Sequence, residues 1–385
     1  MTGEVPTAMD WPVFGFWVGL FVPLISYLLY PVGVILLGRR ARPSSPDSLM
    51  PWPDVTVAIA AHNEEASIER AVRSILAQAY EGPAVKLLIG LDGCTDRTAE
   101  VLAAIGEPRL RVLNLPRVGK ATTDNRLAAA ADTEVVVKTD AGSEFAPGTL
   151  ARLVAPLRDG RIGCATGVFR PRADGTDSSE GEGLYWRLEY RVMDAESRLG
   201  ILAMASGTAL AFRRSAFRPI PADSDADVTV APTVALLGSR VVHVPDAIVY
   251  DDGPTSFGAV LRNRRRMALR ALPATLGLVP RLLLAGRFGA SISLISHKLF
   301  RWLTPVAALV WALSAVALVV RGDPGYVPVV AALAGVGMLG AIVGALNGRT
   351  RGAMASLAVA QLAFSLALVD VIRGRRARTW SRGPE

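Results

Sequence analysis

The chain has few of the residues that build disulfide-linked or zinc-stabilised proteins. Its 385 residues include two cysteines, Cys94 and Cys164, and three histidines, His62, His243 and His297. The histidines are scattered, and no other ligand-type residue stands near them at zinc-ligand spacing. Two cysteines do not make a disulfide framework, and we expect no structural disulfide if the domain that carries them faces the cytosol.

Charge is absent from one long stretch near the N-terminus. Residues 11–38 carry no Asp, Glu, Lys or Arg. The stretch is too long for the core of a signal peptide, and no basic segment precedes it. It is long enough to cross a bilayer, so we predict a transmembrane helix at 11–38.

Three further apolar stretches lie towards the other end, and we expect transmembrane helices within 302–372. They cover residues 303–320, 326–346 and 353–368. Three crossings would place the Arg-rich tail, 373–385, outside, against the positive-inside rule. Either one stretch does not span, or 276–299 enters the bilayer, and the sequence leaves both open.

The net charge of +8 is concentrated beside the apolar stretches. Residues 1–10 contain Glu4 and Asp10 but no Lys or Arg, whereas Arg39, Arg40 and Arg42 follow the first stretch. The positive-inside rule therefore predicts a cytoplasmic middle domain on the plasma (cytoplasmic) membrane. Anionic headgroups and phosphate-bearing substrates suit these arginines, and we find no nucleic-acid-binding motif.

Between the apolar regions, strand-like and helix-like segments alternate. Expected strands begin near residues 54, 85, 110 and 134, and helical patterns follow the first three within residues 68–76, 98–105 and 119–131. This alternation predicts an α/β fold with a mostly parallel sheet covered on both faces. We assign it to residues 51–260, followed by basic interfacial helices at 261–301.

Three of the expected strands end in acidic polar loops. These loops contain His62 with Asn63, Glu64 and Glu65; Asp92 with Asp96; and Asp140. Ligands bind beyond the carboxyl ends of parallel strands, so the three loops predict one site. Each has a simpler explanation when taken alone: Asp-Gly is a common turn, and glutamates suit the first turn of a helix.

Six segments stand in a characteristic order: 58-AIAAHNEE-65, 91-LDGCTDRT-98, 119-GKATTDN-125, 138-KTDAGSEF-145, 206-SGTALAFRRSAF-217 and 223-DSDADVTVAPTVALLGSRVVHVPDA-247. Their order and spacing resemble those of the membrane-bound family 2 glycosyltransferases, which have a GT-A fold. The resemblance extends from about residue 55 to 270 and into 296–305. It implies a loop followed by a helix at 206–217, and a catalytic base, helix, glycine and strand at 223–247.

The resemblance implies roles for particular residues. Asp227 is the implied catalytic base and Asp225 its rival, with a solvated acidic loop as the simpler explanation. Asp140 is the implied ligand of Mg²⁺ or Mn²⁺, which prefer oxygen ligands. The implied nucleotide-sugar-binding residues are His62, Asn63, Glu64, Asp92, Asp96, Lys120, Asp140, Arg264 and Arg266.

Three departures from the family pattern bear on function. Gly142 stands where the metal motif has its second aspartate, and Ala226 replaces the first residue of an acidic pair. Asn263, Arg266 and Met267 stand where processive members have Gln-x-x-Arg-Trp. Without that tryptophan we expect transfer of one or a few sugars. The same basic helix is equally well suited to lipid phosphates.

The expected activity is inverting transfer from a nucleoside diphosphate sugar, a hexose or an N-acetylhexosamine. The acceptor would be membrane-associated: a polyprenyl-linked saccharide, a glycolipid or a nascent polysaccharide. Two alternatives remain, an inactive sugar-binding or scaffold subunit of an export complex and, less well supported, a transporter. The sequence does not specify the sugar, the nucleotide or the oligomeric state.

Overall fold

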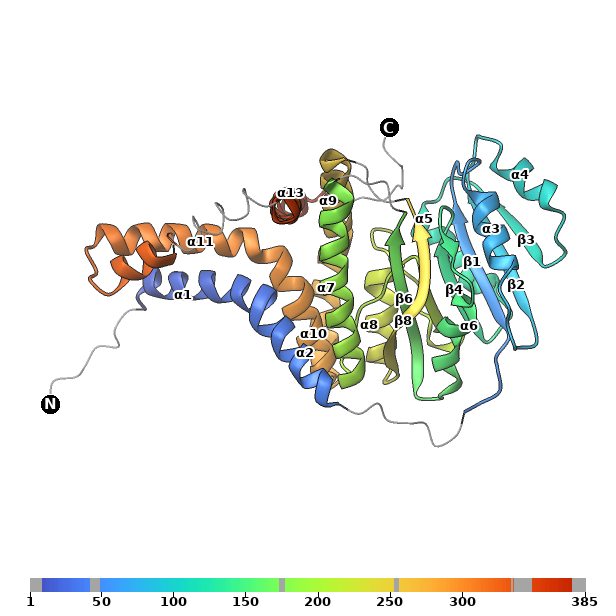
Figure 1. The fold of residues 1–385 in the computed structure, drawn as a ribbon, viewed down its shortest axis with the longest axis horizontal. Coiled ribbons are helices and arrows are strands. Elements are labelled where there is room, and N and C mark those ends of the chain that lie inside the picture. The colour runs from blue at the N-terminus through green and yellow to red at the C-terminus, as the bar shows by residue number, and fades with distance from the viewer. Residues whose placement is uncertain are drawn as a thin grey trace.

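The computed structural model describes residues 9–41, 49–172, 177–252, 256–333, 335 and 348–375. An α/β domain lies at one end of the molecule, and long apolar helices extend from its side (Figure 1). Most of the expected 373–385 tail and residues 336–346 of one expected span lie outside the described residues.

Four parallel strands form the first half of the sheet, as the alternating pattern predicts. They are β1 (Val55–Ala61), β2 (Val85–Asp92), β3 (Leu110–Leu115) and β4 (Val135–Asp140), in the order β3-β2-β1-β4. Because Ala60 pairs with both Gly90 and Asp140, these strands end at one edge of the sheet. The register therefore brings the loops after them together.

The second half of the sheet is mixed, so the sheet as a whole is less parallel than expected. β7 (Leu210–Arg213) is antiparallel to β4 and to β6 (Ile162–Pro171). β8 (Arg240–Asp251) runs parallel to β6, and β5 (Glu144–Phe145) pairs with it at the edge. The complete order of the eight strands is β3-β2-β1-β4-β7-β6-β8-β5.

The helix expected after the loop in 206–217 is wrong. That segment forms strand β7 and a short 3-10 turn, Arg214–Ala216. Leu210, Ala211 and Phe212 are buried between two neighbouring strands, which explains why this short apolar run is extended. By contrast, the helix, glycine and strand expected within 223–247 are confirmed: α8 (Ala226–Leu236) is followed by Gly238 and then by β8.

Helices cover both faces of the sheet, with a core on each. On β1, Val57 and Ile59 belong to the cluster that contains α3 (Ile68–Leu76), whereas Ala58 and Ala60 belong to the cluster that contains α5 (Lys120–Ala130). The connecting helices α4 (Thr98–Ile105), α6 (Thr149–Val154) and the 3-10 turn Ala155–Arg158 complete this domain. Burial on both faces explains why β1 is apolar except for Thr56, whose buried hydroxyl bonds to that of Thr133.

Four apolar helical segments within the described residues are long enough to cross a membrane. Trp11–Arg40 comprises α1 (Trp11–Leu24), a π-helical turn (Ile25–Leu29) and α2 (Tyr30–Arg40). Phe288–Val320 comprises α10 (Phe288–Ser293), a π-helical turn (Leu294–Leu299) and α11 (Phe300–Val320). The other two are α9 (Phe257–Leu284) and Met354–Ile372 within α13 (Gly348–Ile372). α1 lies along α11, away from the sheet (Figure 1).

The expected interfacial region therefore contains α9, which is itself apolar enough to be a candidate span. The stretch 276–299, considered above as an additional membrane segment, is divided between α9 and the start of the next long helix. α9 packs against α8 and α13. This packing places the basic helix α9 against the α/β domain.

A buried polar cluster joins the α/β domain to the apolar helices. Glu189 and Glu196 project from α7 (Asp177–Leu199), which packs on β6 and β8 on one side and on α2 and α13 on the other. Glu189 accepts from Lys298 Nζ at 2.6 Å and from Arg301 Nη1 at 2.7 Å. Glu196 accepts from Tyr30 Oη at 2.6 Å.

His243 and His297 are both buried in packing contacts. The ring nitrogens of His297 lie 3.1 Å from Glu189 Oε2 and 3.1 Å from Glu196 Oε1, so His297 lies within the polar cluster. His243 stacks on Tyr190 of α7, and burial lowers its pKa to about 4. His243 is therefore a packing residue.

Glu189→Gln should destabilise the protein substantially. Lys298 and Arg301 would keep their charges in a buried site without their carboxylate, a change that typically lowers the free energy of unfolding by ~3 kcal/mol. Thermal unfolding of the detergent-solubilised chain measures the loss. Glu69→Gln is the control, since Glu69 forms an exposed pair with Arg73 one turn away. Equal melting temperatures for the two variants would contradict a structural role for the cluster.

Candidate active site

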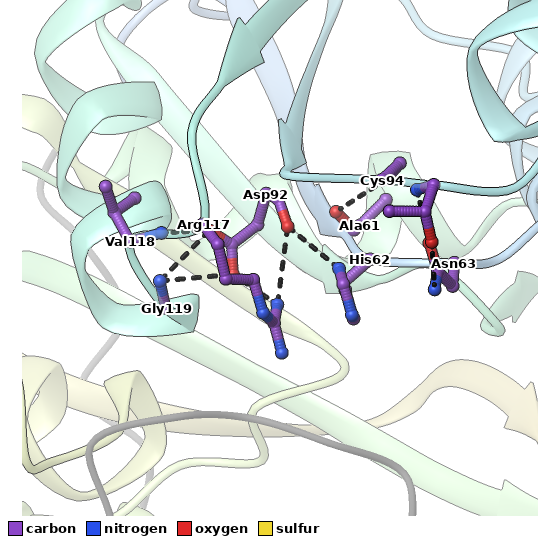
Figure 2. A network of polar contacts seen from close by, with 9 residues as sticks. Ala61, His62, Asn63, Asp92, Cys94, Arg117, Val118 and Gly119 are labelled. Atoms are coloured by element: carbon purple, nitrogen blue, oxygen red, sulfur yellow. Dashed lines mark hydrogen bonds and ion pairs between the residues drawn. The ribbon is translucent and has the colours of Figure 1, made fainter.

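Asp92 organises the edge where the parallel strands end. Its Oδ1 accepts from the backbone nitrogens of Val118 and Gly119 at 2.6 and 3.0 Å. Its Oδ2 accepts from Arg117 Nη1 at 2.6 Å, and the side chain is 1% exposed. Figure 2 shows these bonds converging on the carboxylate from the loop before α5. Asp92 therefore fixes the start of the helix that carries Lys120.

The loops at this edge approach so closely that glycine is required. A Cβ on Gly93 would lie 2.9 Å from the backbone nitrogen of Arg117, and its φ is +62°. Gly119, with φ +88°, precedes α5 directly. Positive φ is strained for residues with a side chain, so both glycines support the cage around Asp92.

The loop after β1 is clamped to the loop after β2. His62 Nδ1 donates to the Asp92 carbonyl at 2.8 Å, which fixes the proton on that nitrogen because a carbonyl only accepts. Asn63, with φ +54°, accepts from the Thr95 nitrogen at 2.9 Å. Asp96 accepts from the Glu65 nitrogen at 3.0 Å.

The predicted nucleotide-binding residues of the strand-end loops and of the start of α5 thus lie at one edge of the sheet, and several of them also hold the loops in place. Glu64 is 3% exposed and accepts from Ser67 Oγ at 2.6 Å. Asp96 accepts from Thr98 Oγ1 at 2.6 Å. Burial alone would raise the pKa of Asp96, but its hydrogen bonds hold that pKa below the usual range. The carboxylates of Glu64, Asp92 and Asp96 therefore have structural bonds, while contact with a nucleotide stays a prediction.

Asp140 stands at the end of β4 between two lysines. Its Oδ1 accepts from Lys120 Nζ at 2.8 Å and from Lys138 Nζ at 2.7 Å. Burial alone would raise the pKa of Asp140, but the two ammonium groups hold it far below its usual value. Lys138, 5% exposed, also donates to the Gly207 carbonyl at 2.8 Å. It therefore links β4 to the loop before β7.

Asp227 also lies next to Gly207. A Cβ on Gly207 would lie 3.5 Å from Asp227 Cβ and 3.9 Å from Lys138 Nζ, so these three residues adjoin. Burial and the charge of Asp225 raise the pKa of Asp227 to about 6, although Lys138 opposes the shift. A carboxylate with such a pKa is suited to accept a proton near neutral pH.

Asp225, the rival base, is already paired. Its Oδ2 lies 3.0 Å from Nε of Arg270, which is 1% exposed on α9. Arg270 also donates to the Ser224 carbonyl, and Asp225 is the residue before α8. Asp225 is therefore engaged in an ion pair, and Asp227 shows no such pair within the described residues. This difference favours Asp227 as the base.

The arginines of the basic helix α9 make different contacts. Arg265 pairs with Asp370 of α13 at 2.7 Å, and Arg270 pairs with Asp225. Arg266 donates to Asn263 at 2.9 Å on its own helix. Arg264 is partly buried on the same helix. Binding of the diphosphate by Arg264 or Arg266 stays a prediction.

Sequence reasoning missed Lys138, Asp124 and the clamp by Asn125. Lys138 interrupts a valine strand just before Asp140, which was the available signal. Asp124 is 7% exposed, and burial raises its pKa even though Lys138 and Lys120 oppose the shift. Asn125 exchanges two 2.8 Å bonds with the backbone of Ile220, which fixes the segment before α8. Only the folded chain brings these groups to the site.

The side chains near Asp140 suit a cation that takes most of its ligands from phosphate and water. Within the described residues, no three His, Cys, Asp or Glu side chains cluster as a metal site. Glu144, two residues after Gly142, is held by Arg70 at 3.0 Å and Arg172 at 2.7 Å. Asp140 remains as a carboxylate that could share Mg²⁺ or Mn²⁺ with phosphate and water, which Mg²⁺ commonly accepts.

Comparison with known families agrees with this geometry. The family model described as Glycosyl transferase family 2 matches residues 56–220, which include β1–β4 and the Asp140 site. Residues 56–220 are a family 2 glycosyltransferase domain. The match includes five of the six motif segments wholly or in large part, and it ends before Asp225 and Asp227.

Curated relatives of this domain are bacterial. An N-acetylglucosaminyltransferase of Mesorhizobium japonicum is 27% identical over 250 residues, covering 60% of this chain and 59% of that protein. The succinoglycan biosynthesis protein ExoO of Rhizobium meliloti is 33% identical over 111 residues, covering 29% of this chain and 31% of that protein. The chain thus spans less than two thirds of the length of these relatives.

A solved structure shares the fold over nearly the whole chain. The mannosyltransferase PcManGT of Pyrobaculum calidifontis, in complex with GDP-Man and Mn²⁺, superposes with a TM-score of 0.67 at 22% identity. The match covers 93% of this chain and 99% of that one. The fold is therefore GT-A-like, as expected, with apolar helices flanking the domain.

Asp92→Asn should loosen the loop before α5. The amide nitrogen cannot accept hydrogen bonds, so one of the donors from Arg117, Val118 or Gly119 loses its partner, a loss of ~1–3 kcal/mol. Hydrogen exchange at the Val118 and Gly119 backbone amides measures this loosening and should be faster in the variant. Asp132→Asn, which alters an exposed pair with Lys86, should leave these amides unchanged. Unchanged exchange in both variants would contradict the cage.

Proposed function

We propose that the chain is an inverting glycosyltransferase that moves a sugar from a nucleoside diphosphate sugar to a membrane-associated acceptor. The observation that carries the proposal is the position of Asp227, a carboxylate with raised pKa beside Gly207 and Lys138. Lys138 in turn contacts Asp140 at the expected donor side. A proton acceptor and a set of positive charges thus lie next to each other.

The chemistry follows from this arrangement. The acceptor hydroxyl oxygen attacks the anomeric carbon, the bond from that carbon to the diphosphate oxygen breaks, and the configuration inverts. Asp227 takes the hydroxyl proton. Lys120 and Lys138 bind the diphosphate, where negative charge grows as it leaves. Asp140 would hold Mg²⁺ or Mn²⁺, and the cation would supply further neutralisation of that charge.

The apolar helices support a membrane-associated acceptor. Four candidate spans adjoin the domain, and α7 ties the sheet to them through its two buried glutamates. We propose a polyprenyl-linked saccharide, a glycolipid or a nascent polysaccharide as acceptor, with the domain on the cytoplasmic side of the plasma membrane. Met267, where processive members have tryptophan, favours transfer of one or a few sugars.

The donor class is a proposal drawn from relatives. The curated relatives named N-acetylglucosaminyltransferase support an N-acetylhexosamine, whereas PcManGT is solved with GDP-Man. A panel of UDP- and GDP-linked sugars, assayed with Mn²⁺, therefore separates the candidates. Absence of both transfer and donor hydrolysis across that panel would favour the inactive scaffold, for which Gly142 and Ala226 are the motivating residues.

Asp227→Asn should bind the donor normally but turn it over ~10²–10⁴ times more slowly, because the acceptor proton then has no base. Steady-state kinetics with the active donor measure kcat, and calorimetry measures donor affinity. Asp223→Asn, in the same acidic segment, is the matched control and should keep its kcat. Normal turnover by Asp227→Asn would remove the base from this position.

The acid limb of the rate profile should follow Asp227. Only the ionised carboxylate accepts a proton, so kcat/KM should fall as pH drops below about 6, the raised pKa of Asp227. The charge of Asp225 contributes to that raised pKa, so Asp225→Asn should move the limb to lower pH. Rates between pH 4.5 and 8, with thermal unfolding checked at each pH, test this. A shift to higher pH would contradict the assignment.

A further inference from the structure

Asp140 is neutralised by the protein before any ligand binds. Two ammonium groups, those of Lys120 and Lys138, share its Oδ1 at 2.8 and 2.7 Å. Their side chains are 16% and 5% exposed, so little water screens these charges. Two positive charges thus face one negative charge at the expected cation ligand.

The surrounding residues offer a cation little else. Gly142 has no side chain, and Glu144 is engaged by Arg70 and Arg172. No three metal-ligating side chains cluster within the described part of the chain. A divalent cation approaching Asp140 in the free protein would therefore meet the two ammonium groups bonded to that carboxylate, and like charges at this range repel strongly.

We propose that Lys138, together with Lys120, makes cation binding at Asp140 conditional on a bound diphosphate. This inference rests on the proposed function. In the free protein the ammonium groups exclude Mg²⁺ or Mn²⁺ from Asp140. A nucleoside diphosphate draws these groups onto its phosphate oxygens, releases the Asp140 carboxylate and adds oxygen ligands, so that the cation binds with the donor rather than before it.

The proposal predicts effects of opposite sign when the Lys138 charge is removed. Lys138→Met keeps most of the buried stem but removes the ammonium group. The charges of Asp140, Asp124 and Asp227 all act on Lys138, so its removal leaves a more negative site. Affinity for a cation alone should rise, and affinity for a diphosphate alone should fall. A loss of structure would lower both affinities.

Mn²⁺ and two nucleotides provide the test, with the full chain in detergent. The free-ion paramagnetic resonance signal measures Mn²⁺ binding without nucleotide, and calorimetry in EDTA measures binding of UDP and of GDP. Lys138→Met should bind Mn²⁺ alone at least tenfold more tightly than wild type. It should bind the preferred nucleotide at least tenfold more weakly. Wild type should bind Mn²⁺ at least tenfold more tightly with that nucleotide than without it, because coupling between two ligands is reciprocal.

Lys86→Met is the matched control, since Lys86 forms an exposed 2.7 Å pair with Asp132 at the opposite end of β2. It should match wild type in both measurements. If Lys138→Met does not fold, Lys120→Met tests the same prediction at a more exposed position.

Two results would overturn the inference: unchanged or weaker Mn²⁺ binding by the folded Lys138→Met protein, or equal losses of Mn²⁺ and nucleotide affinity. Failure of the proposed function is a separate result. Wild type that binds neither UDP nor GDP, even with Mn²⁺, would contradict that function. The Mn²⁺ titration without nucleotide would still decide the role of Lys138.

Discussion

The candidate site depends on the contacts that one buried ammonium group makes, that of Lys138. It lies at the end of β4, contacts Asp140 on its own strand and donates to the Gly207 carbonyl in the loop before β7. β4 belongs to the parallel half of the sheet, and β7 begins the mixed half. A single buried charge therefore joins the expected donor side to the expected acceptor side, where Gly207 adjoins Asp227. Buried charges persist only when they are paired in this way.

The acidic residues of the candidate site form two groups with different tasks. Glu64, Asp92 and Asp96 bond to neighbouring loops and fix their shape. Asp140 and Asp227 have contacts, or a raised pKa, that suit chemistry instead. The first group makes the second possible, because a reacting carboxylate is useful only when rigid surroundings hold it in place.

The long apolar helices also influence the site through buried charges. Lys298 pairs with Glu189 of α7, and its charge also acts on Asp227. Arg270 of α9 holds Asp225, two residues before Asp227 on the chain. Both cations come from the long helices that flank the domain. The position and the pKa of the proposed base thus depend on how the α/β domain packs against these helices.

The sequence by itself determined the local elements and the edge at which the strands converge. Helix 98–105 has the predicted bounds and a strand begins at residue 110 as predicted, because apolar periodicity and turn residues act over short distances. It also indicated Asp140 and Asp227 through the order of the motifs. Only the tertiary structure decided that 206–217 contains the strand Leu210–Arg213, because its partners β4 and β6 are distant in sequence. The same holds for the pairing of Asp225 with Arg270, the cage around Asp92 and the position of Lys138 between Asp140 and Gly207. Each depends on contacts between distant segments, and a one-dimensional pattern of polarity carries no information about which distant charges meet.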